Sequence, residues 1–137
     1  MRTAVDTNVI SALWSREPSA SRMVQLLGRA QAEGGLVIAA AVYAELLAHP
    51  GATGQFVDEF LISTRIALDF DLGESVWRDA AGRFAVYAER RRRSEGGSPK
   101  RLLVDFLIGA HAALKADRLF TLDASRYRED FPNLRLM

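Results

Sequence analysis

Four acidic side chains in this 137-residue sequence stand directly beside apolar segments, where charged groups are normally excluded. They are Asp6, just after the apolar run 3–5; Glu45, within 41–47; Asp105, within 102–108; and Asp123, just after 119–122. Carboxylates are rarely fully buried unless something compensates their charge. One divalent metal site shared by these side chains would compensate all of them. The pattern therefore predicts a metal site built from carboxylate oxygens.

The segments that must position these acids alternate along the chain between strand-like and helix-like patterns. Short apolar runs predict strands at 2–5, 36–38, 66–70, 118–122 and 134–136. Apolar spacing and capping residues predict helices at 8–14, 20–33, 41–48, 53–64, 73–93 and 99–116, with a short helical turn from Ser125. The last long helix is expected to use Ser98 as its cap and Pro99 as its first residue. This alternation favours an α/β fold, with a single domain over residues 1–137 and a mostly parallel five-stranded sheet flanked by helices.

The predicted elements bring the acids toward one edge of the sheet. Ligands of such sheets bind beyond the carboxyl ends of the strands, and Asp6 and Asp123 each follow a predicted strand. Glu45 and Asp105 lie on predicted helices, next to the packing face, where an uncompensated charge costs several kcal/mol. The helix dipole offsets only about 0.3–1 kcal/mol of that cost at Asp105. A bound cation is the larger stabilising contribution.

Composition narrows the class of protein. Eighteen basic and seventeen acidic residues give a formal charge of +1, so overall charge does not indicate a nucleic-acid ligand. The absence of cysteine excludes disulfides and thiolate chemistry. No apolar run approaches the roughly 20 residues that cross a bilayer, and the N-terminus lacks the apolar region of a signal peptide. We expect a soluble cytoplasmic protein without a membrane partner.

Four short motifs in a fixed order resemble those of PIN-domain ribonucleases, in particular the VapC-type toxins of bacterial toxin–antitoxin pairs. The motifs are Asp6-Thr7-Asn8-Val9 after a first strand, Tyr43-Ala44-Glu45-Leu46 on a helix, residues 104–112 opening another helix, and Phe120-Thr121-Leu122-Asp123 ending a late strand. The resemblance extends over essentially the whole chain. Residues 53–97 match no motif of that family, so the toxin subtype and the RNA target stay open.

The resemblance implies a parallel sheet whose gathered acids bind Mg²⁺ or Mn²⁺ and cut single-stranded RNA. Asp6 and Asp105 would be metal ligands, Asp123 a ligand directly or through water, and Glu45 would hold a second ion or a metal-bound water. All four would thus be catalytic residues. The polar neighbours expected to orient them are Thr7, Asn8 and Thr121. The predicted reaction is in-line attack of water on a phosphodiester, with a carboxylate accepting the proton and the RNA 2′-hydroxyl taking no part as nucleophile.

The same resemblance implies a cognate small antitoxin protein as partner, and a homodimer or a toxin–antitoxin hetero-oligomer as the assembly. Such antitoxins wrap an apolar groove and can insert an arginine into the acidic site. Phe56, Phe60 and Leu61 would suit such contacts, although core packing explains them as well.

Each predicted site residue also has an explanation without a metal. Asp6 would cap a helix, Asp105 would be an ordinary first-turn acid, and Asp123 would start a turn or cap the helix at Ser125. Glu45 would pair with an arginine. The remaining acids singled out as surface charges are Asp58, Glu59, Asp69, Asp71 and Asp79, and neither His49 nor His111 is expected to be catalytic.

One basic concentration stands out, formed by Arg90 to Arg93 together with Lys100 and Arg101. It is explained equally well as a solvated helix end and as a phosphate-binding patch beside the acids.

Two other functions compete with the nuclease. One is a catalytically inactive PIN-like module that only binds a partner protein. The other is a phosphatase of the haloacid-dehalogenase type, which requires Asp-x-Asp after its first strand, whereas this chain has Asp6-Thr7-Asn8.

Overall fold

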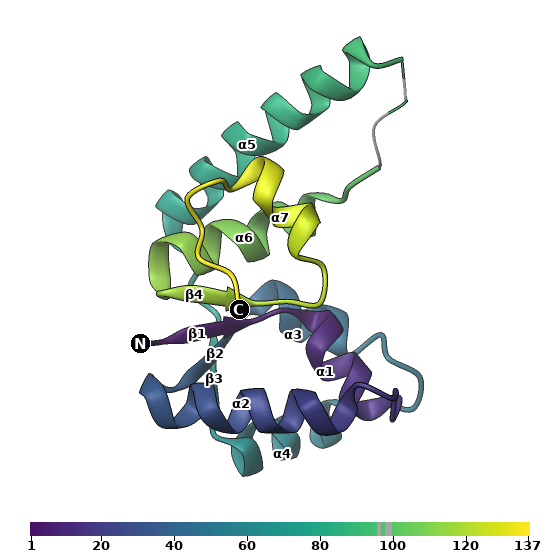
Figure 1. Ribbon diagram of the computed structural model, residues 1–137, viewed down its shortest axis with the longest axis vertical. Helices are drawn as coiled ribbons and strands as arrows, with labels where there is room; N and C mark the ends of the chain where they lie inside the picture. The colour runs from purple at the N-terminus through teal and green to yellow at the C-terminus, as the bar shows by residue number, and fades with distance from the viewer. Residues whose placement is uncertain (96, 98–99) are drawn as a thin grey trace.

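Four parallel strands form the sheet at the centre of the computed structural model, which describes residues 1–95, 97 and 100–137 (Figure 1). They are β1 (Thr3–Val5), β2 (Leu36–Ala39), β3 (Ile66–Asp69) and β4 (Arg118–Phe120), in the order β3-β2-β1-β4. Every residue of the central strands β1 and β2 is buried, as expected for parallel strands covered on both faces. Val5 pairs with Phe120, so the ends of β1 and β4 lie side by side. The predicted α/β fold is confirmed.

Helices cover both faces of this sheet. Within the described residues they are α1 (Thr7–Trp14), α2 (Ala20–Gly34), α3 (Ala40–Leu46), α4 (Gly54–Thr64), α5 (Gly73–Arg93), α6 (Leu103–Lys115) and α7 (Ala124–Asp130). Helices α2 and α4 lie below the sheet in Figure 1, and α5, α6 and α7 lie above it. The long helix α5 packs mainly on α6, and its far end extends away from the rest of the molecule (Figure 1).

The predicted fifth strand is replaced by a single bridge. Leu136 pairs with Leu119 of β4, through bonds from the Leu119 amide to the Arg135 carbonyl (2.9 Å) and from the Met137 amide to the Leu119 carbonyl (2.9 Å). After a turn at residues 132–133, residues 134–136 form only this single bridge with β4, so the expectation of a strand at 134–136 was wrong.

Helix α6 begins later than the sequence pattern suggests. Ser98 and Pro99, the expected cap and first residue, lie outside the described residues, and the described residues just before Leu103 are not helical. The Arg101 amide donates to the Tyr87 hydroxyl at 2.6 Å, and the Leu102 amide donates to the Asp105 carboxylate at 3.3 Å. Leu102 has an extended backbone (φ −100°, ψ 152°) and acts as the N-cap, so the helix starts at Leu103 and Asp105 lies in its first turn.

Helix α7 is held by arginines that converge on Asp130, whose side chain is only 3% exposed. Arg90 of α5 donates to one carboxylate oxygen at 3.0 Å, and Arg101 donates to the other at 2.9 Å. Arg83 donates to the Asp130 carbonyl at 2.7 Å. Arg90 and Arg101 of the basic cluster therefore have a structural explanation, because removing one partner of a buried ion pair typically costs about 3–5 kcal/mol.

A buried histidine links α6 to the end of β3. His111 Nε2 lies 3.1 Å from an Asp69 carboxylate oxygen, and Lys115 Nζ lies 3.6 Å from the same oxygen. Burial lowers the pKa of His111 against the opposing effect of Asp69, so the ring stays neutral near pH 7 and its Nε2–H donates. Asp69 is consequently part of a packed polar contact, and the expectation of a plain surface charge was wrong.

None of the helices in the described part of the chain combines the length and hydropathy that crossing a bilayer requires.

We predict that Gly109→Ala destabilises the fold. Gly109 is buried on α6, and an added Cβ would overlap the ring of Phe131. Overpacking of this kind costs about 1–3 kcal/mol in the free energy of unfolding, measured by urea denaturation.

The matched control is Gly82→Ala on α5, where the new methyl group meets nothing within 4 Å. There the better helix propensity of alanine should stabilise the protein by up to about 1 kcal/mol. Equal effects at the two glycines would contradict the packing explanation.

Candidate active site

Asp6 is the most deeply buried of the predicted acids, at 4% exposure, and it directly follows β1 and caps α1. One carboxylate oxygen accepts the Thr7 amide at 2.7 Å, which confirms the capping explanation. The other oxygen accepts the hydroxyls of Thr121 at 2.8 Å and Tyr127 at 2.9 Å. Cap formation accounts for one oxygen only. The second oxygen is directed toward residues that follow β4, where Asp123 also lies.

Glu45 joins this group from α3. Its carboxylate accepts the Thr7 hydroxyl at 2.6 Å, so Thr7 connects Asp6 and Glu45 through its amide and its side chain. Burial raises the pKa of Glu45, and the negative charges of Asp6 and Asp105 raise it further against the opposing Thr7 hydrogen bond. The carboxylates of β1, α3 and α6 are thus close enough to repel one another.

Burial also raises the pKa of Asp6, although the hydrogen bonds from Thr121, Tyr127 and Thr7 oppose this effect. The charge of Asp105 adds to the rise. For the same reasons the pKa of Tyr127 is raised well above its ordinary value, by burial first and by Asp6 second, which keeps its hydroxyl protonated as a donor. The carboxylate end of β1 is therefore a site where an added positive charge would be stabilising.

Asp105 and Asp123 meet through an arginine that the sequence reasoning did not single out. Arg126 of α7 places Nη1 3.2 Å from an Asp105 oxygen and Nε 3.1 Å from an Asp123 oxygen. Asp123 precedes α7 and also accepts the Ser125 hydroxyl at 3.1 Å, although its side chain forms no capping bond to the helix backbone. The i,i+3 spacing of Asp123 and Arg126 in the sequence was a signal for their ion pair. No sequence signal indicated the contact between Arg126 and Asp105.

The polar neighbours named from the sequence tie β1 to β4. Asn8 donates to the Thr121 hydroxyl at 3.3 Å and accepts the Leu122 amide at 3.1 Å. Thr121 in turn accepts the Asp123 amide at 3.0 Å while donating to Asp6. Thr121 thus orients Asp6 directly, and Asn8 acts on it only through Thr121.

Comparison with known proteins assigns the chain to a family. The sequence model of the PIN domain matches residues 3–131, which is nearly the whole chain. The chain belongs to the PIN-domain family. A search among curated proteins found no sequence match.

Two solved structures have a similar fold. One is VapBC2 from Rickettsia felis, bound to a DNA fragment from its promoter, with a TM-score of 0.65 and 20% identity over 100% of this chain and 98% of the other. The second is VapBC-1 from nontypeable Haemophilus influenzae, with a TM-score of 0.67 and 20% identity over 100% of this chain and 97% of the other. At this identity the likeness establishes the fold.

The carboxylates of this PIN domain fit a hard divalent cation by chemistry, although they do not form a complete set of ligands as they stand. Within residues 1–95, 97 and 100–137, no three Asp, Glu or His side chains are grouped closely enough to hold one ion. Mg²⁺ takes oxygen ligands and usually only one or two carboxylates, with water and substrate supplying the rest. Asp6, Asp105 and Asp123 offer such oxygens, and a bound cation would oppose the rise in the pKa of Asp6 and of Glu45 that burial and the neighbouring carboxylates cause.

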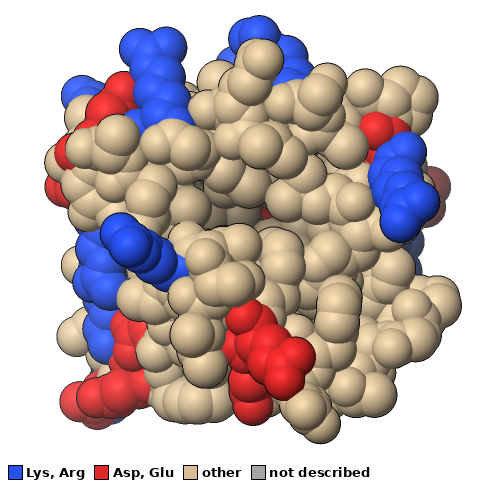
Figure 2. All heavy atoms as spheres, turned by 90° about the horizontal axis from the view of Figure 1, so that it is seen from below, with Lys and Arg blue, Asp and Glu red and all other residues tan. Residues whose placement is uncertain are grey.

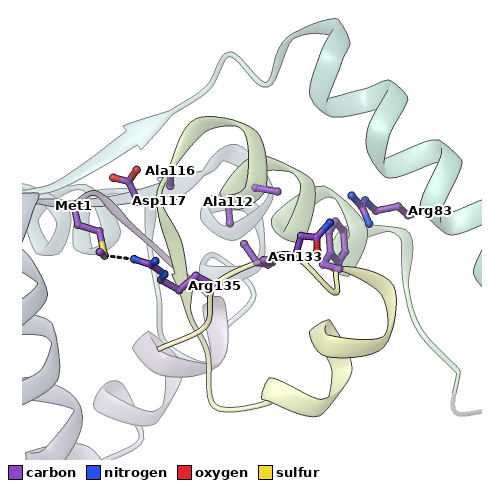
Figure 3. Close-up of a pocket in the computed structure, with 10 residues that line it drawn as sticks. Met1, Arg83, Ala112, Ala116, Asp117, Asn133 and Arg135 are labelled. Carbon is purple, nitrogen blue, oxygen red and sulfur yellow. Dashed lines mark hydrogen bonds between the residues drawn. The ribbon is translucent and has the colours of Figure 1, made fainter.

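A cavity of about 600 Å³ lies elsewhere on the molecule, between the C-terminal half of α6 and the end of the chain (Figure 3). Arg83 and Arg135 point toward it from different elements, and Asp117 and Asn133 also line it (Figure 3). None of the predicted site acids borders this cavity. The acidic group is therefore recognised by its charges and hydrogen bonds, since it does not lie in this cavity.

We predict that Tyr127→Phe weakens the fold around Asp6. Removing the hydroxyl leaves a buried carboxylate oxygen with one donor fewer, which should lower the free energy of unfolding by about 1–3 kcal/mol. Denaturant unfolding monitored by circular dichroism measures the change.

Tyr43→Phe is the matched control, because the Tyr43 hydroxyl donates to Asp58 in an exposed contact of 3.0 Å. That loss should change stability by less than about 0.5 kcal/mol. If both variants lose the same amount, Tyr127 does not have the special role assigned here.

Proposed function

We propose that this PIN domain is a metal-dependent endoribonuclease and the toxin of a type II toxin–antitoxin pair. The observation that carries the proposal is the arrangement of carboxylates from β1, α3, α6 and the β4–α7 junction beside the carboxyl end of β1. The bonds from Thr121 and Tyr127 to Asp6, and from Thr7 to Glu45, support it. Family membership supports it independently.

In this proposal Asp6, Asp105 and Asp123 hold Mg²⁺ or Mn²⁺, and all four acids including Glu45 are catalytic. The ion, when bound, supplies positive charge that activates water and stabilises charge developing on the phosphodiester. Asp6 is fixed in orientation by its three donors. Glu45 is partly buried with a raised pKa, which suits the carboxylate that accepts the proton of the attacking water.

Asn8 bears on the competing phosphatase function. The haloacid-dehalogenase type needs a second acid at this position, and here the Asn8 amide is bonded on both sides, to Thr121 and to Leu122. Asn8 therefore serves to join β1 to β4. The inactive interaction module remains the alternative, and the same assay distinguishes it from the nuclease.

We predict cleavage of mixed single-stranded RNA by the purified protein with Mg²⁺ or Mn²⁺, and its loss with a chelator. Changing a residue that merely supports a metal ligand costs about 10–100-fold, so Asp6→Asn, which alters a proposed ligand, should lower the rate by at least about 100-fold. Gel assays measure cleavage, and circular dichroism verifies folding.

Asp58→Asn on α4 provides the matched control, since it makes the same chemical change at an exposed carboxylate outside the acidic group. It should cleave like the unaltered protein. Undiminished cleavage by Asp6→Asn would contradict the proposed site, and no cleavage by any form with either metal would favour the interaction module.

We further propose that a small antitoxin binds the face formed by α2 and α4. Figure 2 looks onto this side from below and shows broad uncharged areas, with most Lys and Arg side chains toward the edges. Phe56 is 44% exposed and Ile62 is 78% exposed on α4, whereas Leu61 is buried in the core and Phe60 packs against it. Of the three residues named from the sequence, Phe56 is therefore the one suited to a partner. Assembly as a homodimer or a toxin–antitoxin hetero-oligomer belongs to this proposal.

Expression of this chain alone should arrest bacterial growth, and co-expression of the small open reading frame beside its gene should relieve the arrest. Growth curves after induction give the readout. Asp6→Asn should be harmless at equal protein levels, because toxicity depends on cleavage. Arrest by Asp6→Asn as strong as that of the unaltered chain would disconnect toxicity from the acidic site.

A further inference from the structure

Arg126 places a positive charge between two acids of the site. Its guanidinium lies 3.2 Å from Asp105 and 3.1 Å from Asp123, bridging acids that are 18 residues apart in the sequence. Its charge also acts on Glu45, where it opposes the rise in pKa caused by burial and by the other carboxylates. A single side chain of α7 thus neutralises much of the acidic group from within the same chain.

The positive charge of Arg126 lies beside both Asp105 and Asp123, so it repels a divalent ion that would bind between them. The guanidinium stands between the two carboxylates and uses an oxygen of each. This arrangement agrees with the finding that, across the described part of the chain, no three acids are grouped closely enough to hold a metal.

The side chain of Arg126 has room to leave while its backbone stays fixed. The Arg126 carbonyl accepts the Arg101 guanidinium, and the next residue, Tyr127, is buried and bonded to Asp6. The Arg126 side chain itself is 39% exposed, so it can move from the acids toward solvent by rotation of its own bonds. Displacement requires no movement of α7.

We propose that Arg126 is an internal counter-ion that competes with the divalent ion for Asp105 and Asp123, so that metal binding displaces its guanidinium toward solvent. The proposal rests on the proposed function, because it takes these two acids to be metal ligands. It predicts opposite effects of removing the arginine. The metal-free protein loses stability, since the carboxylates then repel one another, and the same repulsion strengthens metal binding.

The test compares Mn²⁺ binding to chelator-treated protein by isothermal titration calorimetry, with thermal unfolding recorded in parallel. Arg126→Ala should bind Mn²⁺ about three- to tenfold more tightly, the range expected for releasing two partly exposed ion pairs. Its metal-free melting temperature should fall, and its rise on adding Mn²⁺ should exceed that of the unaltered protein. Arg126→Gln keeps most of the side-chain length and replaces the alanine variant if that one does not fold.

Arg128→Ala is the matched control, because Arg128 is an exposed arginine of the same helix. It should leave Mn²⁺ affinity unchanged. Adding Asp105→Asn to Arg126→Ala should remove the gain, which assigns the binding to this site.

Equal Mn²⁺ affinity with and without Arg126 overturns the counter-ion role while leaving the metal site intact. Absence of Mn²⁺ binding in every variant overturns the metal site itself, and the counter-ion role with it. A gain that persists with Asp105→Asn also overturns the proposal, because the ion would then lie elsewhere.

Discussion

The burial of one carboxylate, that of Asp6, is the constraint on which the rest of the site depends. Parallel pairing of β1 with β4 sets Val5 opposite Phe120, so the residues after both strands emerge together. Thr121 and Tyr127 can then donate to Asp6, and the Thr7 amide completes its hydrogen bonds. Without these donors a buried carboxylate would cost several kcal/mol. The sheet register and the hydrogen bonds of Asp6 are therefore mutually dependent.

Satisfying Asp6 does not neutralise the group around it. Hydrogen bonds stabilise individual oxygens, but burial and mutual repulsion still raise the pKa values of Asp6 and Glu45. An added positive charge is therefore favourable at this place. In the structure that charge comes from Arg126, and in the proposed nuclease it would come from a metal. A site that accepts either cation has a simple physical basis, since both neutralise the same oxygens.

The positions of Asp6 and Asp123 beyond the ends of β1 and β4 could be predicted because the signal is local. A charge next to an apolar run is visible in a single segment, and alternating elements indicate a parallel sheet whose strand ends coincide. The contacts of Tyr127 with Asp6 and of Arg126 with Asp105 had no such signal, because these partners are far apart in the sequence. The start of α6 was misplaced for a related reason. The Arg101 amide bonds to Tyr87 of α5, which no local propensity reveals.

Helix α7 contacts both the acidic site and two arginines of the basic cluster. Arg126 contacts two acids, Tyr127 contacts Asp6, and Asp130 receives Arg90 and Arg101, all within seven residues. A helix this short is not stable by itself, because nucleation costs more than a few backbone bonds return. Its position must therefore come from tertiary contacts, which Tyr127 near its middle makes with Asp6 and Asp130 at its end makes with the arginines. The basic cluster thereby contributes to the acidic site through α7, whether or not any of its members touches RNA.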